Sequence, residues 1–137
     1  MNNDKFQLYY SLIYLILILD QSYCQQEYVG VVVENFEQNN LNGLYEEAAL
    51  VNNRPVYIQF VREKSVNKRK DNCIWWHLES RRWQIGSCHD IGSKSKNYGA
   101  YFDEDVKCLP GAQTKDRWKQ TSSNNYLSGR TEGIKLL

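Results

Sequence analysis

Residues 72–88, NCIWWHLESRRWQIGSC, constrain the fold more than any other part of the chain. Apolar and polar side chains alternate on both sides of the polar stretch 79–82, which is the pattern of a two-stranded β-hairpin. If the loop is centred between residues 80 and 81, residues whose numbers sum to 161 lie opposite each other. One face then carries an almost wholly apolar set that predicts a core surface: Ile74, Trp76, Leu78, Trp83, Ile85 and Ser87.

The opposite face combines one large aromatic ring with polar groups. It carries Cys73, Trp75, His77, Glu79, Arg82, Gln84, Gly86 and Cys88. An outward-facing Trp75 beside His77, Arg82 and Gln84 would offer a flat apolar platform with directional hydrogen bonds. These four residues are the predicted ligand-binding site. In the alternative, a second sheet or the strand near residues 100–103 covers Trp75 and makes it part of the core.

The N-terminal residues 1–24 have the layout of a secretory signal peptide. A polar start is followed by the apolar run LIYLILIL at 12–19 and a short polar tail. Even residues 6–19 would form a helix of only about 21 Å, against roughly 30 Å of membrane core, so we expect no stable membrane insertion. The small residues Ser22 and Cys24 predict cleavage before Gln25 and a secreted, extracellular chain.

The cysteines support the same hairpin. In the predicted register Cys73 lies opposite Cys88 in a non-hydrogen-bonded pair with a Cα separation of about 4.5 Å, within reach of a disulfide. A Cys73–Cys88 bond of this loop length would stabilise the chain by about 3 kcal/mol. The competing bond would join Cys88 to Cys108. With cleavage after Cys24 an odd cysteine remains, and Cys108 is then a free or intermolecular thiol.

The rest of the chain predicts an antiparallel all-β domain over residues 25–120, either a sandwich or a small barrel built of hairpins. Breaks are expected at 39–43, 52–55, 63–72 and 92–99, and residues 121–137 are expected to form a polar, flexible tail. The predicted strands cover residues 28–36, 44–51, 56–62, 73–78, 83–88 and 100–103, with a weaker one near Trp118.

The charge balance argues against a nucleic-acid partner. The chain carries 17 basic and 16 acidic residues, a formal net charge of +1. Its one basic run is expected to be a solvated loop, with binding to sulfated polysaccharide or cleavage by a protease as alternatives. The run comprises Arg62, Lys64, Lys68, Arg69 and Lys70.

Signals for catalysis or metal binding are weak, and no cofactor is expected. The sequence contains no G-x-S-x-G, H-E-x-x-H or glycine-rich phosphate loop. Cys73, His77, Cys88 and His89 lack the spacing of a zinc site. The adjacent acids at 103–105 are expected to be solvated.

Several short motifs follow one another in a recognisable order. They are LNGLY at 41–45, NNRPVY at 52–57, WWH at 75–77, WQIG at 83–86 and GAY at 99–101. Together they resemble an aromatic-rich module of extracellular proteins from aquatic invertebrates and protists. The resemblance implies secretion and a β-rich fold, and no catalytic residue. Asn53 stands where such modules more often have glycine, and asparagine also tolerates the positive φ of a tight turn.

Taken together, the sequence predicts a secreted, non-enzymatic recognition module that binds glycan or an extracellular surface protein. The alternative is a matrix component that forms oligomers through Cys108. A small secreted hydrolase is a weaker alternative.

Overall fold

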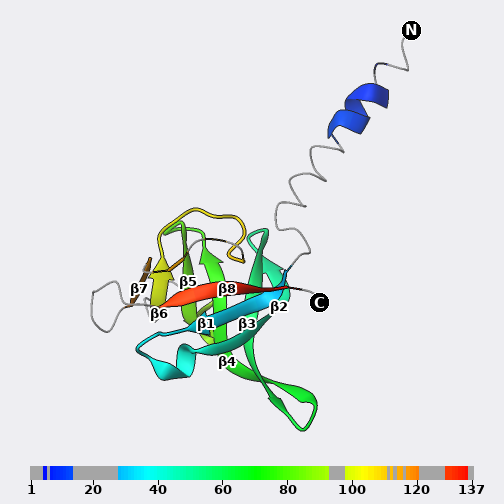
Figure 1. The fold of residues 1–137 in the computed structure, drawn as a ribbon. Coiled ribbons are helices and arrows are strands. Elements are labelled where there is room, and N and C mark those ends of the chain that lie inside the picture. Colours follow the sequence, from blue (N-terminus) through cyan, green and yellow to red (C-terminus); the bar gives the residue numbers. More distant parts are fainter. Residues whose placement is uncertain are drawn as a thin grey trace.

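The computed structural model describes residues 5, 7–13, 28–92, 98–110, 112, 114, 115, 117–120 and 129–135. Residues 7–13 are helical, and the rest of the described chain is dominated by strands (Figure 1). The strands are β1 (Tyr28–Glu34), β2 (Gly43–Val51), β3 (Arg54–Glu63), β4 (Val66–His77), β5 (Arg82–Ser87), β6 (Tyr98–Phe102), β7 (Trp118–Gln120) and β8 (Arg130–Lys135). Two short 3₁₀ helices, η1 (Asn39–Leu41) and η2 (Cys88–Asp90), lie between them. The predicted all-β class is confirmed.

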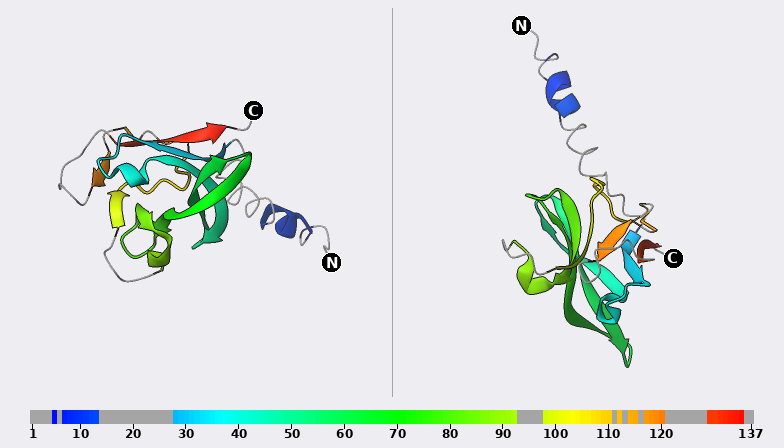
Figure 2. Two further views of the ribbon diagram at one scale, coloured as in Figure 1. Left: turned by 90° about the horizontal axis from the view of Figure 1, so that it is seen from below. Right: turned by 90° about the vertical axis from the view of Figure 1, so that its left-hand side faces the viewer.

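All eight strands belong to one antiparallel sheet that curls into a nearly closed barrel (Figures 1 and 2). Strands β1 to β7 follow each other as neighbours, and β8 returns to pair with β1. Side chains connect the edge strand β8 both to β7 and to the segment before β7. The Trp118 indole donates to the Thr131 hydroxyl at 3.3 Å, and the Thr114 hydroxyl donates to the Thr131 carbonyl at 2.9 Å. These contacts favour the barrel over the sandwich.

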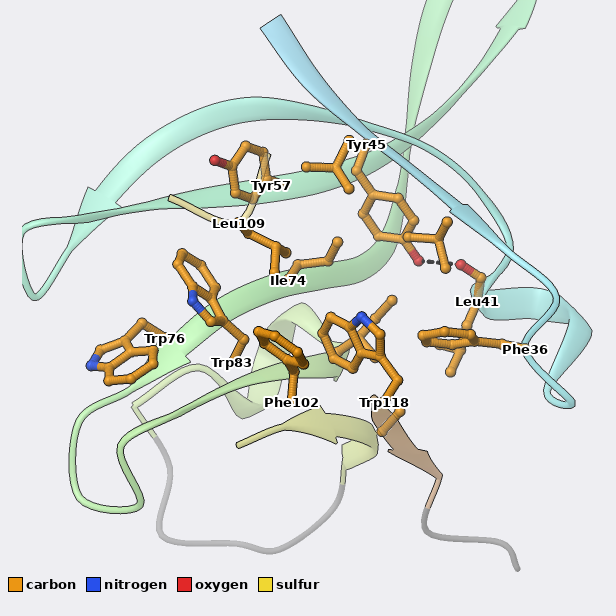
Figure 3. Close-up of a cluster of buried hydrophobic side chains, with 14 residues drawn as sticks. Phe36, Leu41, Tyr45, Tyr57, Ile74, Trp76, Trp83, Phe102, Leu109 and Trp118 are labelled. Carbon is orange, nitrogen blue, oxygen red and sulfur yellow. Dashed lines mark hydrogen bonds between the residues drawn. The ribbon is translucent and has the colours of Figure 1, made fainter. Parts of the chain in front are cut away.

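Large aromatic side chains fill the barrel, as expected for an interior of this size (Figure 3). Phe102 and Trp118 are fully buried, with ring centroids 5.6 Å apart, and Phe36 packs 5.5 Å from Trp118. The buried Tyr45 hydroxyl donates to the Leu41 carbonyl at 2.7 Å. Burial raises the pKa of Tyr45 well above its usual range, because the charged phenolate would lose its hydration.

The β4–β5 hairpin has the predicted faces but not the predicted register. Trp76 pairs with Trp83 and Ile74 with Ile85, so opposite residues sum to 159 instead of 161. A shift of two residues leaves the side chains of β4 and β5 on their predicted faces. It moves the turn to residues 78–81, where Arg81 adopts a left-handed φ of 50°. The expectation that Leu78 lies in the core is therefore wrong, and this side chain is 60% exposed.

The charged stretch 63–72 is not the predicted loop. β3 continues to Glu63 and β4 begins at Val66, with only Lys64 and Ser65 between them. Both turn residues have positive φ, 48° and 66°, as a two-residue hairpin turn requires. The sequence concealed this turn because neither residue is glycine. Asn53 also has a positive φ, 61°, as predicted.

The predicted flexible tail is wrong for residues 130–135, which form β8 in the sheet. An ion pair of 2.8 Å between Arg130 Nη2 and Glu34 Oε2 supports its pairing with β1. Residues 121–128 of that tail lie outside the described part of the chain, as does the predicted cleavage position after residue 24.

Candidate functional site

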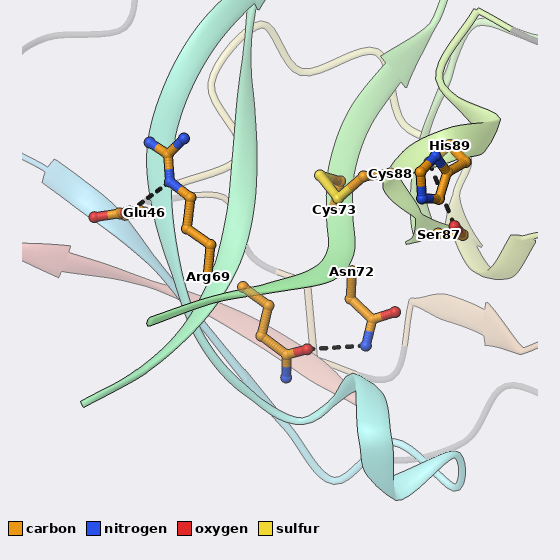
Figure 4. The surroundings of a disulfide bond; sticks show 8 residues. Glu46, Arg69, Asn72, Cys73, Ser87, Cys88 and His89 are labelled. Atoms are coloured by element: carbon orange, nitrogen blue, oxygen red, sulfur yellow. Dashed lines mark hydrogen bonds and ion pairs between the residues drawn. A yellow bond between two sulfur atoms is a disulfide. The ribbon is translucent and has the colours of Figure 1, made fainter. Parts of the chain in front are cut away.

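The predicted Cys73–Cys88 disulfide is present, with Cα atoms 4.9 Å apart (Figure 4). Its setting differs from the prediction, because Cys73 lies opposite Gly86 and Cys88 begins η2 beyond the end of β5. The Ser87 side chain accepts a hydrogen bond of 3.3 Å from the His89 amide at the start of this turn. The disulfide therefore holds η2 against β4.

Cys108 is not the free or intermolecular thiol that the sequence predicted. It is disulfide-bonded within the chain, and none of the described cysteines is free. Since Cys73 and Cys88 bond each other, the alternative Cys88–Cys108 bond is also wrong. The prediction failed because it assumed an odd number of cysteines after cleavage.

The structure also overturns the exposed platform predicted at Trp75. This side chain is only 2% exposed and packs with Val56 and Cys73 in a second apolar cluster, on the outer face of the sheet. Half-buried side chains complete the cluster: Val51, Ile58, Cys88 and Ile91. The disulfide and η2 bring Cys88 and Ile91 to this face, so neither a second sheet nor residues 100–103 are needed to cover the indole. Its Nε1 has no hydrogen-bond partner among the described residues.

The other three predicted site residues have different surroundings and do not form one site with Trp75. Gln84 pairs with Trp75 across the strands and is 3% exposed, so it is buried with the indole. His77 pairs with Arg82 and holds the turn, where its Nδ1 lies 2.8 Å from the Ser80 hydroxyl. Arg82 remains half-buried at the surface of the outer face.

Arg82 packs against two tyrosines that the sequence analysis did not select. Its guanidinium carbon lies 4.1 Å from the ring centroid of Tyr101 and 4.7 Å from that of Tyr98, and Nη2 donates a short hydrogen bond to the Tyr98 hydroxyl. The two rings meet edge to face, 5.7 Å apart. Lys119 Nζ lies 5.8 Å from the Tyr101 ring. We call Arg82, Tyr98, Tyr101 and Lys119 the tyrosine–arginine cluster.

A bulge in β6 brings the two tyrosines to the same face. Ile85 pairs with Ala100 but Gly86 pairs with Tyr98, which leaves Gly99 as the extra residue. A Cβ atom on Gly99 would lie 2.5 Å from Leu41 Cδ1, so a larger residue does not fit without displacement. The alternation of Ala100, Tyr101 and Phe102 could have placed Tyr101 outside, but no signal in the sequence revealed the bulge.

The cluster combines two half-buried aromatic rings with two cations. Aromatic faces pack against the C–H groups of a sugar ring, while guanidinium and ammonium groups donate hydrogen bonds to hydroxyl or carboxylate oxygens. The Arg82 side chain is already held by both rings, so little side-chain entropy is lost when a ligand binds. The arrangement is therefore suited to binding a polar ligand with an apolar face.

Within the described residues, no three histidine, cysteine or acidic side chains gather closely enough to hold a metal ion. The described helical residues do not include a segment long and apolar enough to cross a membrane. Comparisons of the chain with protein-family models, curated proteins and solved structures find no match. The resemblance to the aromatic-rich extracellular module remains a prediction.

Proposed function

We propose that this protein is a secreted, non-enzymatic recognition module that binds glycan through the tyrosine–arginine cluster. The observation that carries the proposal is the Arg82 guanidinium packed over the rings of Tyr98 and Tyr101, which remain half-exposed on the outer face. The apolar N-terminal run and the disulfides support an extracellular setting.

The position of the cluster in the sheet favours binding by a rigid surface. Arg82 comes from β5, the tyrosines from β6 and Lys119 from β7, and neighbouring strands hold these side chains in register. Residues on paired strands move little relative to each other, so the spacing between the rings and the cations is set before a ligand arrives. A surface protein that inserts an apolar or acidic side chain here is the alternative ligand.

A glycan array probed with the wild-type protein and with Tyr101→Ala tests the proposal. We expect wild-type binding to a subset of glycans, and a loss of about tenfold or more in Tyr101→Ala, because truncation of an aromatic anchor removes a large share of binding energy. Tyr101→Phe should retain most of the binding, since the ring is kept. Leu50→Ala is the matched control, because Leu50 is 69% exposed and lies on β2, outside the cluster.

Two results would contradict the proposal. The wild-type protein could bind no glycan, or Tyr101→Ala could bind as the wild type does. Circular dichroism of each variant establishes that the fold is retained. Binding to an extracellular protein that is lost in Tyr101→Ala, with no glycan bound, would assign the cluster to the alternative ligand.

A further inference from the structure

The last residues of β3 and the first residues of β4 project from the barrel as a two-stranded arm. We call residues 62–71 the basic ribbon. It extends away from the rest of the sheet in two views, as the green hairpin in Figures 1 and 2. Every residue in it is exposed, although most are paired in the β3–β4 ladder. The predicted solvated loop is thus an ordered element that holds its side chains at fixed spacing.

The charge of the ribbon is opposite to that of the remaining chain. Its five cations stand against the two carboxylates of Glu63 and Asp71, a net charge of +3. Because the whole chain has a net charge of +1, the rest carries −2. Such separation of charge orients the protein toward a polyanion at long range, even though the overall balance is near neutral.

Most of these cations have no ion-pair partner in the part of the chain that the structure describes. Arg69 forms an ion pair of 3.2 Å with Glu46. The other four, Arg62, Lys64, Lys68 and Lys70, make no ion pair among the described residues. A bound anion would therefore meet charges for which no described carboxylate competes.

The pairing register arranges donors on both sides of the ribbon. Arg62 pairs with Asn67 and Phe60 with Arg69, so the two arginines are diagonal neighbours on one face, about 7–8 Å apart. Lys68 pairs with Val61 on the other face, and Lys70 follows in the irregular stretch 70–72, where β4 has two more residues than β3. A linear polymer with repeated anionic groups can contact several of these donors at once.

We propose that the basic ribbon binds sulfated polysaccharide, as a second site that is distinct from the tyrosine–arginine cluster. The choice of an extracellular polyanion rests on the proposed secretion. The ribbon has no aromatic residue on which a nucleic-acid base could stack, and Val66 is its one apolar side chain, too little to insert into a membrane. The protein would thus combine local glycan recognition with electrostatic retention on a sulfated matrix.

Heparin is the test probe, in affinity chromatography and calorimetry at about 0.1 M salt, where charges act over roughly 10 Å. We expect the wild type to bind heparin and to lose affinity as salt is raised. Arg62→Gln/Lys68→Gln/Lys70→Gln should lose about tenfold or more, because three charge contacts are removed. The matched control Arg81→Gln/Lys115→Gln/Arg117→Gln removes the same charge from exposed positions outside the ribbon and should stay within about twofold.

Several results would overturn the proposal. They are an absence of wild-type binding, an equal loss in both triple variants, and unchanged binding to fully desulfated heparin. Stronger binding to DNA or to anionic phosphatidylserine vesicles than to heparin would assign the ribbon to another partner. If the cations only prevent strand edges from pairing, the ribbon variant would aggregate while its soluble fraction still bound heparin. The ribbon variant should keep its glycan-array pattern, so failure of this proposal is distinguishable from failure of the cluster.

Discussion

Substitution of Leu78 tests the observed hairpin register against the one that the sequence alone favoured, and substitution of Trp75 tests whether the indole is covered on the outer face. The predicted register places Leu78 in the core, and the predicted ligand-binding site requires Trp75 to be exposed. The structure has Trp75 2% exposed and Leu78 60% exposed. We therefore expect Trp75→Ala to destabilise the protein strongly and Leu78→Ala to have little effect.

The magnitude follows from the apolar area. A buried tryptophan removes about 150–250 Å² from water, which at about 25 cal/mol/Å² corresponds to roughly 4–6 kcal/mol. Residual burial in the unfolded chain lowers this hydrophobic stabilisation by up to about 40%. The buried indole N–H, which has no partner among the described residues, costs free energy that offsets a further part of it. The expected loss for Trp75→Ala is about 3 kcal/mol. Leu78→Ala in an exposed turn should change stability by less than about 0.5 kcal/mol.

The assay is urea unfolding of the oxidised protein, followed by far-ultraviolet circular dichroism so that removal of one indole does not alter the probe. Trp75→Phe is a second variant that keeps most of the apolar volume and removes the unpartnered N–H, so it should be less destabilising than Trp75→Ala. A larger loss for Leu78→Ala than for Trp75→Ala would refute the observed register and the burial of the indole.

Three further predictions concern the disulfides and a buried tyrosine. Cys73→Ala/Cys88→Ala should lower the free energy of unfolding by about 3 kcal/mol in urea titrations, and an unchanged midpoint would show that the bond adds no stability. Because Cys108 is disulfide-bonded, thiol titration of the denatured, unreduced protein should find no free thiol at this position; a reactive Cys108 would contradict this. Burial raises the folded-state pKa of Tyr45 above its ordinary value of 10.0. The stability that the neutral Tyr45 hydroxyl contributes is therefore fully present below about pH 10 and is lost as the pH rises toward the folded-state pKa. Tyr45→Phe should be about 1 kcal/mol less stable than the wild type at neutral pH, because it loses the hydrogen bond to Leu41. Above pH 10 the variant should lose less stability than the wild type. If the melting temperatures of the two proteins instead fall in parallel as pH rises, Tyr45 is not the cause of the pH dependence.

The candidate site shows where prediction from sequence stops. Arg82 was found because its position in an alternating pattern placed it on the polar face of the hairpin. Its partner Tyr98 was missed because the bulge at Gly99 places Tyr98 on the same face as Tyr101, which simple alternation along the chain does not indicate. Cys108 was assigned wrongly because the prediction counted the cysteines left after an assumed cleavage.

The sequence by itself determined the β class, the faces of the β4–β5 hairpin and the Cys73–Cys88 bond. Side-chain alternation has a period of two residues, so face membership survives a register error of two, and the two cysteines stay within bonding reach. Only the tertiary structure decided which outward-facing side chains meet solvent. The exposure of these side chains depends on η2 folding over Trp75, on β6 bringing its tyrosines beside Arg82 and on β8 pairing with β1. Each of these is a contact between segments that no local sequence pattern links.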